Sequence, residues 1–258
     1  MRNVIAVAGK ELRHYFHSPI AYLVMTVWAA LCGVIFYILT AAFVSQALRM
    51  QMMGGMGAPP MSINEFIVRP MLQGILMVVL LFLLPLVTMR LYAEEKRSGT
   101  IELLLTSPLT DMQIILGKFL GALVLYSVLV AITFLYLAVL FFYGNPNARP
   151  LIANALGLLL FGAALLALGM WFSTFTKNQI IAGVLSMVIF LLLFIADWPQ
   201  NFSSSAPVKV LAYMSLSNHL DNFAKGVIDL GDVVYYLSGV ALGIFLTARS
   251  VDALKGRA

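Results

Sequence analysis

The chain has 258 residues, of which 62% are hydrophobic and only 10% are charged, and its mean hydropathy is +0.97. Soluble globular domains are about one quarter charged, so these values exclude that class and predict an integral membrane protein. A formal net charge of +5 would suggest a nucleic-acid partner for a soluble chain. In a membrane protein its distribution between loops is the informative quantity, and we expect no nucleic acid to bind.

Six apolar runs predict an all-α polytopic membrane protein, a single domain over residues 1–258 with six transmembrane helices. Most runs reach the roughly 20 residues that cross about 30 Å of hydrocarbon. The fifth and sixth are near the lower limit of about 17 residues, which leaves a tilted or re-entrant arrangement open for them. The runs cover residues 20–44, 70–91, 119–143, 151–173, 180–196 and 232–248.

Basic residues divide unevenly between the two sets of segments that flank these runs. One set holds Arg2, Lys10, Arg13, Arg90, Lys96, Arg97, Lys118, Lys177, Arg249, Lys255 and Arg257, and the other holds Arg49, Arg69, Arg149, Lys209 and Lys225. Cytoplasmic loops carry the excess of Lys and Arg, so both termini and the loop 92–118 are predicted to be cytoplasmic.

Residues 1–18 are predicted to form an amphipathic helix before the first span. Its apolar stripe, which lies opposite Lys10, Arg13 and His14, consists of Ile5, Ala8, Leu12 and Tyr15. Ser18-Pro19 ends the pattern. We expect this helix to lie flat at the cytoplasmic interface, either as a plain anchor or as a contact for a partner.

A methionine cluster follows the first span, in the sequence RMQMMGGMGAPPM of residues 49–61. Its candidate copper ligands are Met50, Met52, Met53, Met56 and Met61. Thioethers are soft ligands that suit Cu(I), so a glycine-rich loop can gather several around one ion. The alternative is a flexible loop in which methionine is merely adaptable, and the absence of His and Cys from the cluster favours it.

The loop after the second span has the strongest local signals. Residues 90–97 continue the helix, with Glu94 spaced to pair with Arg90 and Arg97, until Ser98-Gly99 breaks it. Thr100 caps a further helix of about two turns, which has Glu102 in its first turn and ends at Ser107-Pro108. Residues 110–113 match a capping box, so the third span begins there.

The two-turn helix shows three consecutive leucines to the cytosol, Leu103, Leu104 and Leu105. A helix this short is unstable alone in water, so something must cover these side chains. They either fold back on the membrane surface and neighbouring helices or enter a groove on a soluble partner, with the flanking charges fixing the register.

The extracytoplasmic loop 197–231 contains a third amphipathic segment. Its stripe of Leu216, Leu220, Phe223 and Val227 lies opposite Asp221, Asn222 and Lys225. His219 in the same stretch is more readily an interface or hydrogen-bonded residue than a metal ligand, because it is a lone candidate. In the sixth run, Gly239 and Gly243 have GxxxG spacing, which indicates close helix packing or a dimer seam.

Several classes of function lack the residues that they need. No Asp, Glu, Lys, Arg or His lies in the middle of a run, which argues against a proton-coupled transporter and an intramembrane enzyme. Gly117-Lys118 is followed by Phe119 and lacks the upstream glycine of a P-loop, so this chain is not expected to bind ATP phosphates itself.

The stretch EEKRSGTIELLLTSPLTDMQIILGK resembles the cytoplasmic loop of ABC-2 superfamily permeases, in particular the gliding-motility and copper-enzyme-maturation branch. The matching residues are Glu94, Glu95, Lys96, Arg97, Gly99, Thr100, Glu102, Leu103, Leu104, Pro108, Gly117 and Lys118. Six spans and a cytoplasmic N-terminal helix agree in pattern over nearly the full length. The resemblance implies a coupling helix, formed by this loop with Leu105, that docks on a separate ATP-binding subunit.

The resemblance further implies an exporter-type permease in a bacterial inner (cytoplasmic) membrane. Two six-span subunits, identical or different, would form a dimer with two ATPase subunits, which bind ATP and Mg²⁺, while this chain carries no cofactor. An extracytoplasmic accessory subunit and membrane lipid are further expected partners, and short extracellular helices would cover the translocation path. The alternative is a non-transporting scaffold or mechanotransmitter that an ABC ATPase drives.

Overall fold

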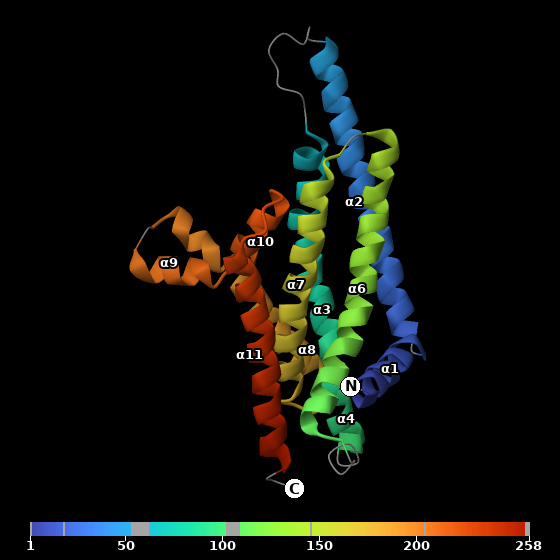
Figure 1. Ribbon diagram of the computed structural model, residues 1–258, viewed down its shortest axis with the longest axis vertical. Helices are drawn as coiled ribbons and strands as arrows, with labels where there is room; N and C mark the ends of the chain where they lie inside the picture. Colours follow the sequence, from blue (N-terminus) through green and yellow to red (C-terminus); the bar gives the residue numbers. More distant parts are fainter. Residues whose placement is uncertain are drawn as a thin grey trace.

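The computed structural model describes residues 2–17, 19–52, 62–101, 109–144, 146–203 and 205–255. Within these residues the secondary structure is entirely helical, and six helices are long and apolar enough to cross a membrane. They are Ala21–Met52, Asn64–Ser98, Asp111–Tyr143, Ala148–Ser173, Gln179–Asn201 and Leu230–Leu254. The predicted six-span, all-α fold is thus confirmed, and Figure 1 shows the spans side by side in one elongated bundle.

The last two spans are longer than their apolar runs. The fifth consists of α8 (Gln179–Phe194) and the 3₁₀ helix η3 (Ile195–Asn201), and the sixth is α11 (Leu230–Lys255). The expectation of a short sixth span is wrong, because the helix begins at Leu230, before the run, and continues through Arg249, which the run excludes. A helix needs hydrogen-bonded backbone, not apolar side chains, to continue past the hydrocarbon.

The fourth span, α7 (Ala148–Ser173), is the centre of the bundle, with 67% of its most apolar window buried. It packs closely on α11, where a Cβ added to Gly243 would lie 2.6 Å from a backbone atom of Ala167. Gly239 faces Ala164 in the same contact. The GxxxG pair therefore serves close packing within the chain, and these glycines do not form a dimer seam.

The first span, α2 (Pro19–Met52), lies at the edge of the bundle, with only 17% of its window buried. It is fastened to the third span, α6 (Asp111–Tyr143), where the Trp28 indole donates to the carbonyl of Leu129 at 2.9 Å and to the hydroxyl of Thr133 at 3.1 Å. At the end opposite the termini, α2 extends beyond its neighbours (Figure 1).

Part of the methionine cluster lies on this extension rather than in a loop. The helix runs through Met50 and Met52, and Met52 is 85% exposed. Residues two apart on a helix do not face each other, so this pair is not a copper site by itself. Met53, Met56 and Met61 lie outside the described residues, and the copper hypothesis stays a prediction.

The end of the bundle that holds both termini is called the terminal end below. Figure 1 places α1 (Arg2–His17) across this end, beside α4 (Arg90–Ser98) and the start of α6. The predicted N-terminal helix is confirmed, but its buried face is shifted to Val7, Ala8, Glu11 and Tyr15. Ile5 is 69% exposed, because α1 turns the other side of its stripe against α6.

The short helices α9 (Ala206–Tyr213) and α10 (Leu216–Ala224) lie farther toward the opposite end: α10 packs on α7, and α9 packs on η3 and projects from the side of the bundle (Figure 1). The predicted stripe is confirmed for Leu216, Leu220 and Phe223, which are at most 3% exposed. It is wrong for Val227, which is 54% exposed, because α10 ends at Ala224 and Gly226 turns the chain with a φ of 81°.

His219 is hydrogen-bonded, in agreement with the preferred interpretation of its sequence context. Its Nδ1 lies 2.7 Å from the Asp232 carboxylate and its Nε2 lies 2.9 Å from the Tyr213 carbonyl oxygen. The ring also stacks on Tyr235 with centroids 3.8 Å apart.

The second span is not one regular helix. It begins with the π-helical segments η1 (Asn64–Val68) and η2 (Pro70–Ile75), continues as α3 (Leu76–Thr88) and then as α4. Near its start, Arg69 binds Asp221 of α10 at 2.5 Å, and Gln73 donates to the carbonyl of Leu220 at 2.8 Å. These contacts join α10 to the second span.

Candidate functional site

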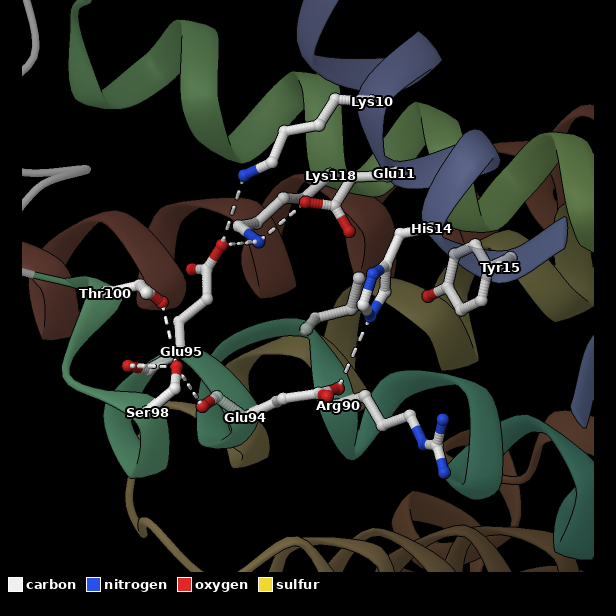
Figure 2. A pocket seen from close by; sticks show the side chains of 11 residues that line it. Lys10, Glu11, His14, Tyr15, Arg90, Glu94, Glu95, Ser98, Thr100 and Lys118 are labelled. Atoms are coloured by element: carbon white, nitrogen blue, oxygen red, sulfur yellow. Dashed lines mark hydrogen bonds and ion pairs between the residues drawn. The ribbon is translucent and has the colours of Figure 1, made fainter. Parts of the chain in front are cut away.

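A cavity of about 310 Å³ lies at the terminal end, between α1, α4 and the start of α6. Figure 2 shows that the side chains around it are mostly polar and come from all three helices. They include Lys10, Glu11, His14, Tyr15, Arg90, Glu94, Glu95, Ser98, Thr100 and Lys118. The cavity thus adjoins the charged stretch that the sequence singled out.

The ammonium group of Lys118 is the centre of this site. The side chain is 1% exposed, and its Nζ donates to Glu11 at 2.9 Å and to Glu95 at 2.7 Å. Lys10 reaches Glu95 at 3.9 Å, and the Tyr92 ring lies 5.3 Å from the Lys118 ammonium. A buried cation with two carboxylate partners joins α1, α4 and α6 into one unit, since losing a partner would leave a charge buried without compensation.

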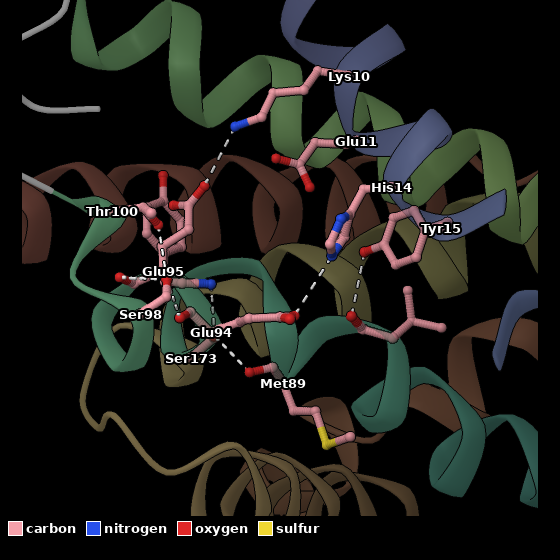
Figure 3. Close-up of polar contacts among 12 residues, drawn as sticks. Lys10, Glu11, His14, Tyr15, Met89, Glu94, Glu95, Ser98, Thr100 and Ser173 are labelled. Carbon is pink, nitrogen blue, oxygen red and sulfur yellow. Dashed lines mark hydrogen bonds and ion pairs between the residues drawn. The ribbon is translucent and has the colours of Figure 1, made fainter. Parts of the chain in front are cut away.

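A second set of contacts holds the end of α1 against the start of α4. The His14 Nε2 lies 3.7 Å from a Glu94 oxygen, and the Tyr15 hydroxyl donates to the carbonyl of Val87 at 3.3 Å (Figure 3). Burial and the nearby Glu11 carboxylate raise the pKa of Tyr15, so the phenol stays a neutral donor.

These contacts correct the expected pairing of Glu94 with Arg90 and Arg97. Among the described residues, the ion pairs of Glu94 and Glu95 run to α1 and α6 rather than along α4. The partners on other helices are favoured because a carboxylate that is partly removed from water is stabilised more by a cation held in place than by a solvated cation on its own helix.

Ser173, at the end of α7, holds the junction where α3 becomes α4. Its Oγ accepts from the backbone N–H groups of Tyr92 and Ala93, both at 3.0 Å, and donates to the carbonyl of Met89 at 3.0 Å (Figure 3). One hydroxyl therefore satisfies three backbone groups that the helix break leaves open. Lys96 also donates to the carbonyl of Thr174, so α4 is fixed to α7 as well.

The predicted break at Ser98-Gly99 is confirmed. Gly99 ends α4 with a φ of 74°, in the left-handed region where glycine carries no steric cost. The predicted capping box is also present, because Thr110 accepts from the Gln113 backbone and the Gln113 side chain accepts from the Thr110 N–H. The chain therefore leaves α4 and enters α6 at the predicted positions.

Of the predicted coupling residues, the structure brings Glu94, Glu95 and Thr100 together at this site. Lys96 binds the carbonyl of Thr174 instead, Gly99 ends α4, and Arg97 is exposed on the same helix. The remaining predicted coupling residues, Glu102, Leu103, Leu104, Leu105 and Pro108, lie outside the described residues. Sequence reasoning missed the roles of Glu11, Lys118 and Ser173. Glu11 had a visible signal, since an acidic residue one turn from both Ala8 and Tyr15 interrupts an otherwise apolar face, and Lys118 matched the family motif without an indication of its partners.

A comparison with protein families identifies this arrangement. Residues 58–216, more than half of the chain, match the family described as ABC-2 family transporter protein. The chain belongs to the ABC-2 transporter family. The match includes the second to fifth spans and the whole of α4, but not α1, α2 or α11.

Members of the ABC-2 family are the membrane-spanning permease subunits of ABC transporters, which work with an ABC ATPase and in general as dimers. The chain is therefore a multi-pass permease subunit. No curated protein matches it.

Proposed function

We propose that this ABC-2 permease is of the exporter type, and that its terminal end faces the bacterial cytosol and docks on a separate ATPase. The residues after Gly99, with Leu103, Leu104 and Leu105, form the coupling helix that seats in the ATPase. The excess of Lys and Arg on this side supports the orientation. ATP and Mg²⁺ bind to the partner subunit, and a second permease, identical or different, completes the transporter.

One observation carries this proposal: α4 is fixed at several points along its length. Ser173 fixes its start, Lys118 fixes its middle through Glu95, and Lys96 fixes it to the end of α7. A displacement applied beyond Gly99 therefore moves α4 together with α1, α6 and α7, since packed elements move as rigid bodies. This is how closure of the ATPase would reach the spans.

The alternative, a mechanotransmitter that moves no substrate, is supported by the character of the exposed surface. Within the apolar run of α2, the large exposed side chains are apolar or aromatic: Tyr22, Leu23, Val27, Val34, Tyr37, Ile38 and Val44. The large exposed polar side chains of this helix follow beyond the run, at Gln46, Arg49 and Gln51. A subunit that lines a path for a polar substrate would show more polar groups on one such face. A pull-down of the tagged protein in mild detergent separates the two functions by the extracytoplasmic proteins and substrates that co-purify with it.

The docking role is tested by Leu104→Asp. A carboxylate placed in an apolar groove without a partner costs several kcal/mol, so we expect the ATPase to be lost from the detergent-purified complex while the permease stays inserted. The matched control is Leu211→Asp in α9, where the leucine is 48% exposed at the other end of the bundle. The docking helix is ruled out if both variants retain the ATPase equally.

A further inference from the structure

Arg90 lines the cavity without a partner among the described residues. Its Nε is buried and has no hydrogen-bond partner, although the two lysines of the cavity, Lys10 and Lys118, both bind carboxylates. Figure 2 shows the Arg90 side chain extending away from Glu94 and Glu95. Arg90 is half-buried, so its Nε is shielded from water while the rest of the guanidinium can still be reached by an anion from outside the chain.

A narrow apolar crevice begins beside this guanidinium. Its lining includes Ala21 and Val24 of α2, Leu86 of α3 and Leu125 of α6, together with Arg90 and His14. Three of these apolar side chains are at most 7% exposed, but Leu86 is 49% exposed. The crevice therefore opens to the outside of the bundle along α3.

The open side continues as an apolar stripe toward the middle of the span. Phe82, Leu86 and Arg90 are four residues apart, so they lie on one side of the second span. Phe82 is 44% exposed and Leu86 is 49% exposed. Arg90 lies at the end of the apolar run 70–91, at the level where hydrocarbon gives way to headgroups.

We propose that Arg90 is the headgroup site for an anionic phospholipid, whose acyl chain lies along Leu86 and Phe82. A guanidinium binds phosphate oxygens with two parallel hydrogen bonds, and basic pockets between spans recognise anionic headgroups. The site leaves Arg90 open to an anion, because Glu11 and Glu95 bind Lys118 and no carboxylate of the described residues forms an ion pair with Arg90. Free phosphate would use the guanidinium but not the apolar stripe, so the lipid is the better occupant.

This lipid site adjoins α4, the helix through which the proposed coupling would act, but it does not depend on that function. A lipid phosphate on Arg90 would touch the first residue of α4 and the His14 turn of α1. The membrane would then fix the start of α4 from outside the bundle, opposite to Ser173, which fixes it from inside. Lipid binding is measured here without the ATPase, so its failure and failure of the docking proposal are distinguishable.

The test is native mass spectrometry of the full-length protein in detergent, titrated with phosphatidylglycerol or phosphatidylcholine. We expect wild-type protein to retain phosphatidylglycerol about tenfold better, and Arg90→Gln to lose that preference, because one charge-assisted phosphate contact is worth about that factor. The matched control is Arg97→Gln, which removes the same charge from the exposed side of the same helix and should keep the preference.

Three results would overturn the proposal: equal retention of both lipids by the wild type, an unchanged preference in Arg90→Gln, or displacement of phosphatidylglycerol by an equal concentration of inorganic phosphate. Should Arg90→Gln fail to fold, the wild-type lipid comparison decides alone. Leu86→Ser then tests the acyl-chain contact, and retention of phosphatidylglycerol as tight as in the wild type would also overturn the site.

Discussion

The two ends of the bundle each contain a buried contact between a basic and an acidic side chain, but these contacts connect different parts of the chain. At the terminal end, Lys118 joins Glu11 and Glu95, so one side chain connects three helices, and Glu11 is 107 residues away from it in the sequence. At the opposite end, His219 and Asp232 are only 13 residues apart and join α10 to the start of α11. Another pair of that end, Arg69 with Asp221, has both side chains 36% exposed.

This difference indicates where the molecule can move independently. Breaking the Lys118 cluster would release α1 and α4 together, so the terminal end responds as one body. At the opposite end, the polar contacts of the short helices are either close in sequence or partly exposed. Exposed ion pairs commonly contribute under about 1 kcal/mol to stability. We expect the α10 region to open at lower free energy than the α1–α4–α6 unit.

Lys118→Met removes the buried cation of the terminal end and should have the largest effect on stability. Methionine fills similar space but leaves two buried carboxylates facing each other, at a cost of about 3–5 kcal/mol. We expect a much lower thermal stability in detergent and faster hydrogen exchange in α1. Adding Glu11→Gln and Glu95→Gln should restore part of the loss. Wild-type exchange in α1 of the single variant would show that Lys118 does not hold the unit together.

Asp232→Asn tests the buried pair of the opposite end. The carboxylate accepts from His219 at 2.7 Å on one oxygen and from Asn222 at 2.8 Å on the other, whereas an amide has one oxygen only. One donor must lose its acceptor, which costs about 1.5–3 kcal/mol. Hydrogen exchange should rise in α10 and stay unchanged in α1. Equal acceleration at both ends would contradict the independence of the two regions.

Asp221→Asn should have the smallest effect, under about 1 kcal/mol, because the pairs with Arg69 and Lys225 are partly exposed. Burial opposes ionisation of Asp221, but hydrogen bonds from Lys225 and Arg69 outweigh it and lower its pKa. A lowered pKa in the folded state stabilises above the unfolded pKa of about 4, and this contribution is lost as the pH falls through the folded value. Thermal stability near neutral pH, with and without added salt, measures it, and a salt-independent loss of several kcal/mol would be the contrary result.

Local features of the fold could be read from the sequence alone. The apolar runs placed all six spans, Thr110 and Gln113 marked the start of α6, and Gly99 marked the end of α4. Each of these signals acts through the backbone or hydration of a few neighbouring residues. Burying unpaired backbone groups or exposing apolar side chains costs free energy in any fold. Such features can therefore be predicted from the sequence without knowing the tertiary contacts.

The candidate site was decided by the packing of helices. The spacing of Glu94 with Arg90 and Arg97 predicted local pairs, whereas α1 and α6 supply the observed partners of α4. Nothing near Ser173 shows that its hydroxyl will meet the backbone of Met89, Tyr92 and Ala93. Periodicity shows that a helix has an apolar side, but which residues of that side are buried depends on the neighbour that covers it. For α1 that neighbour is α6, which buries Glu11 against Lys118 and leaves Ile5 exposed.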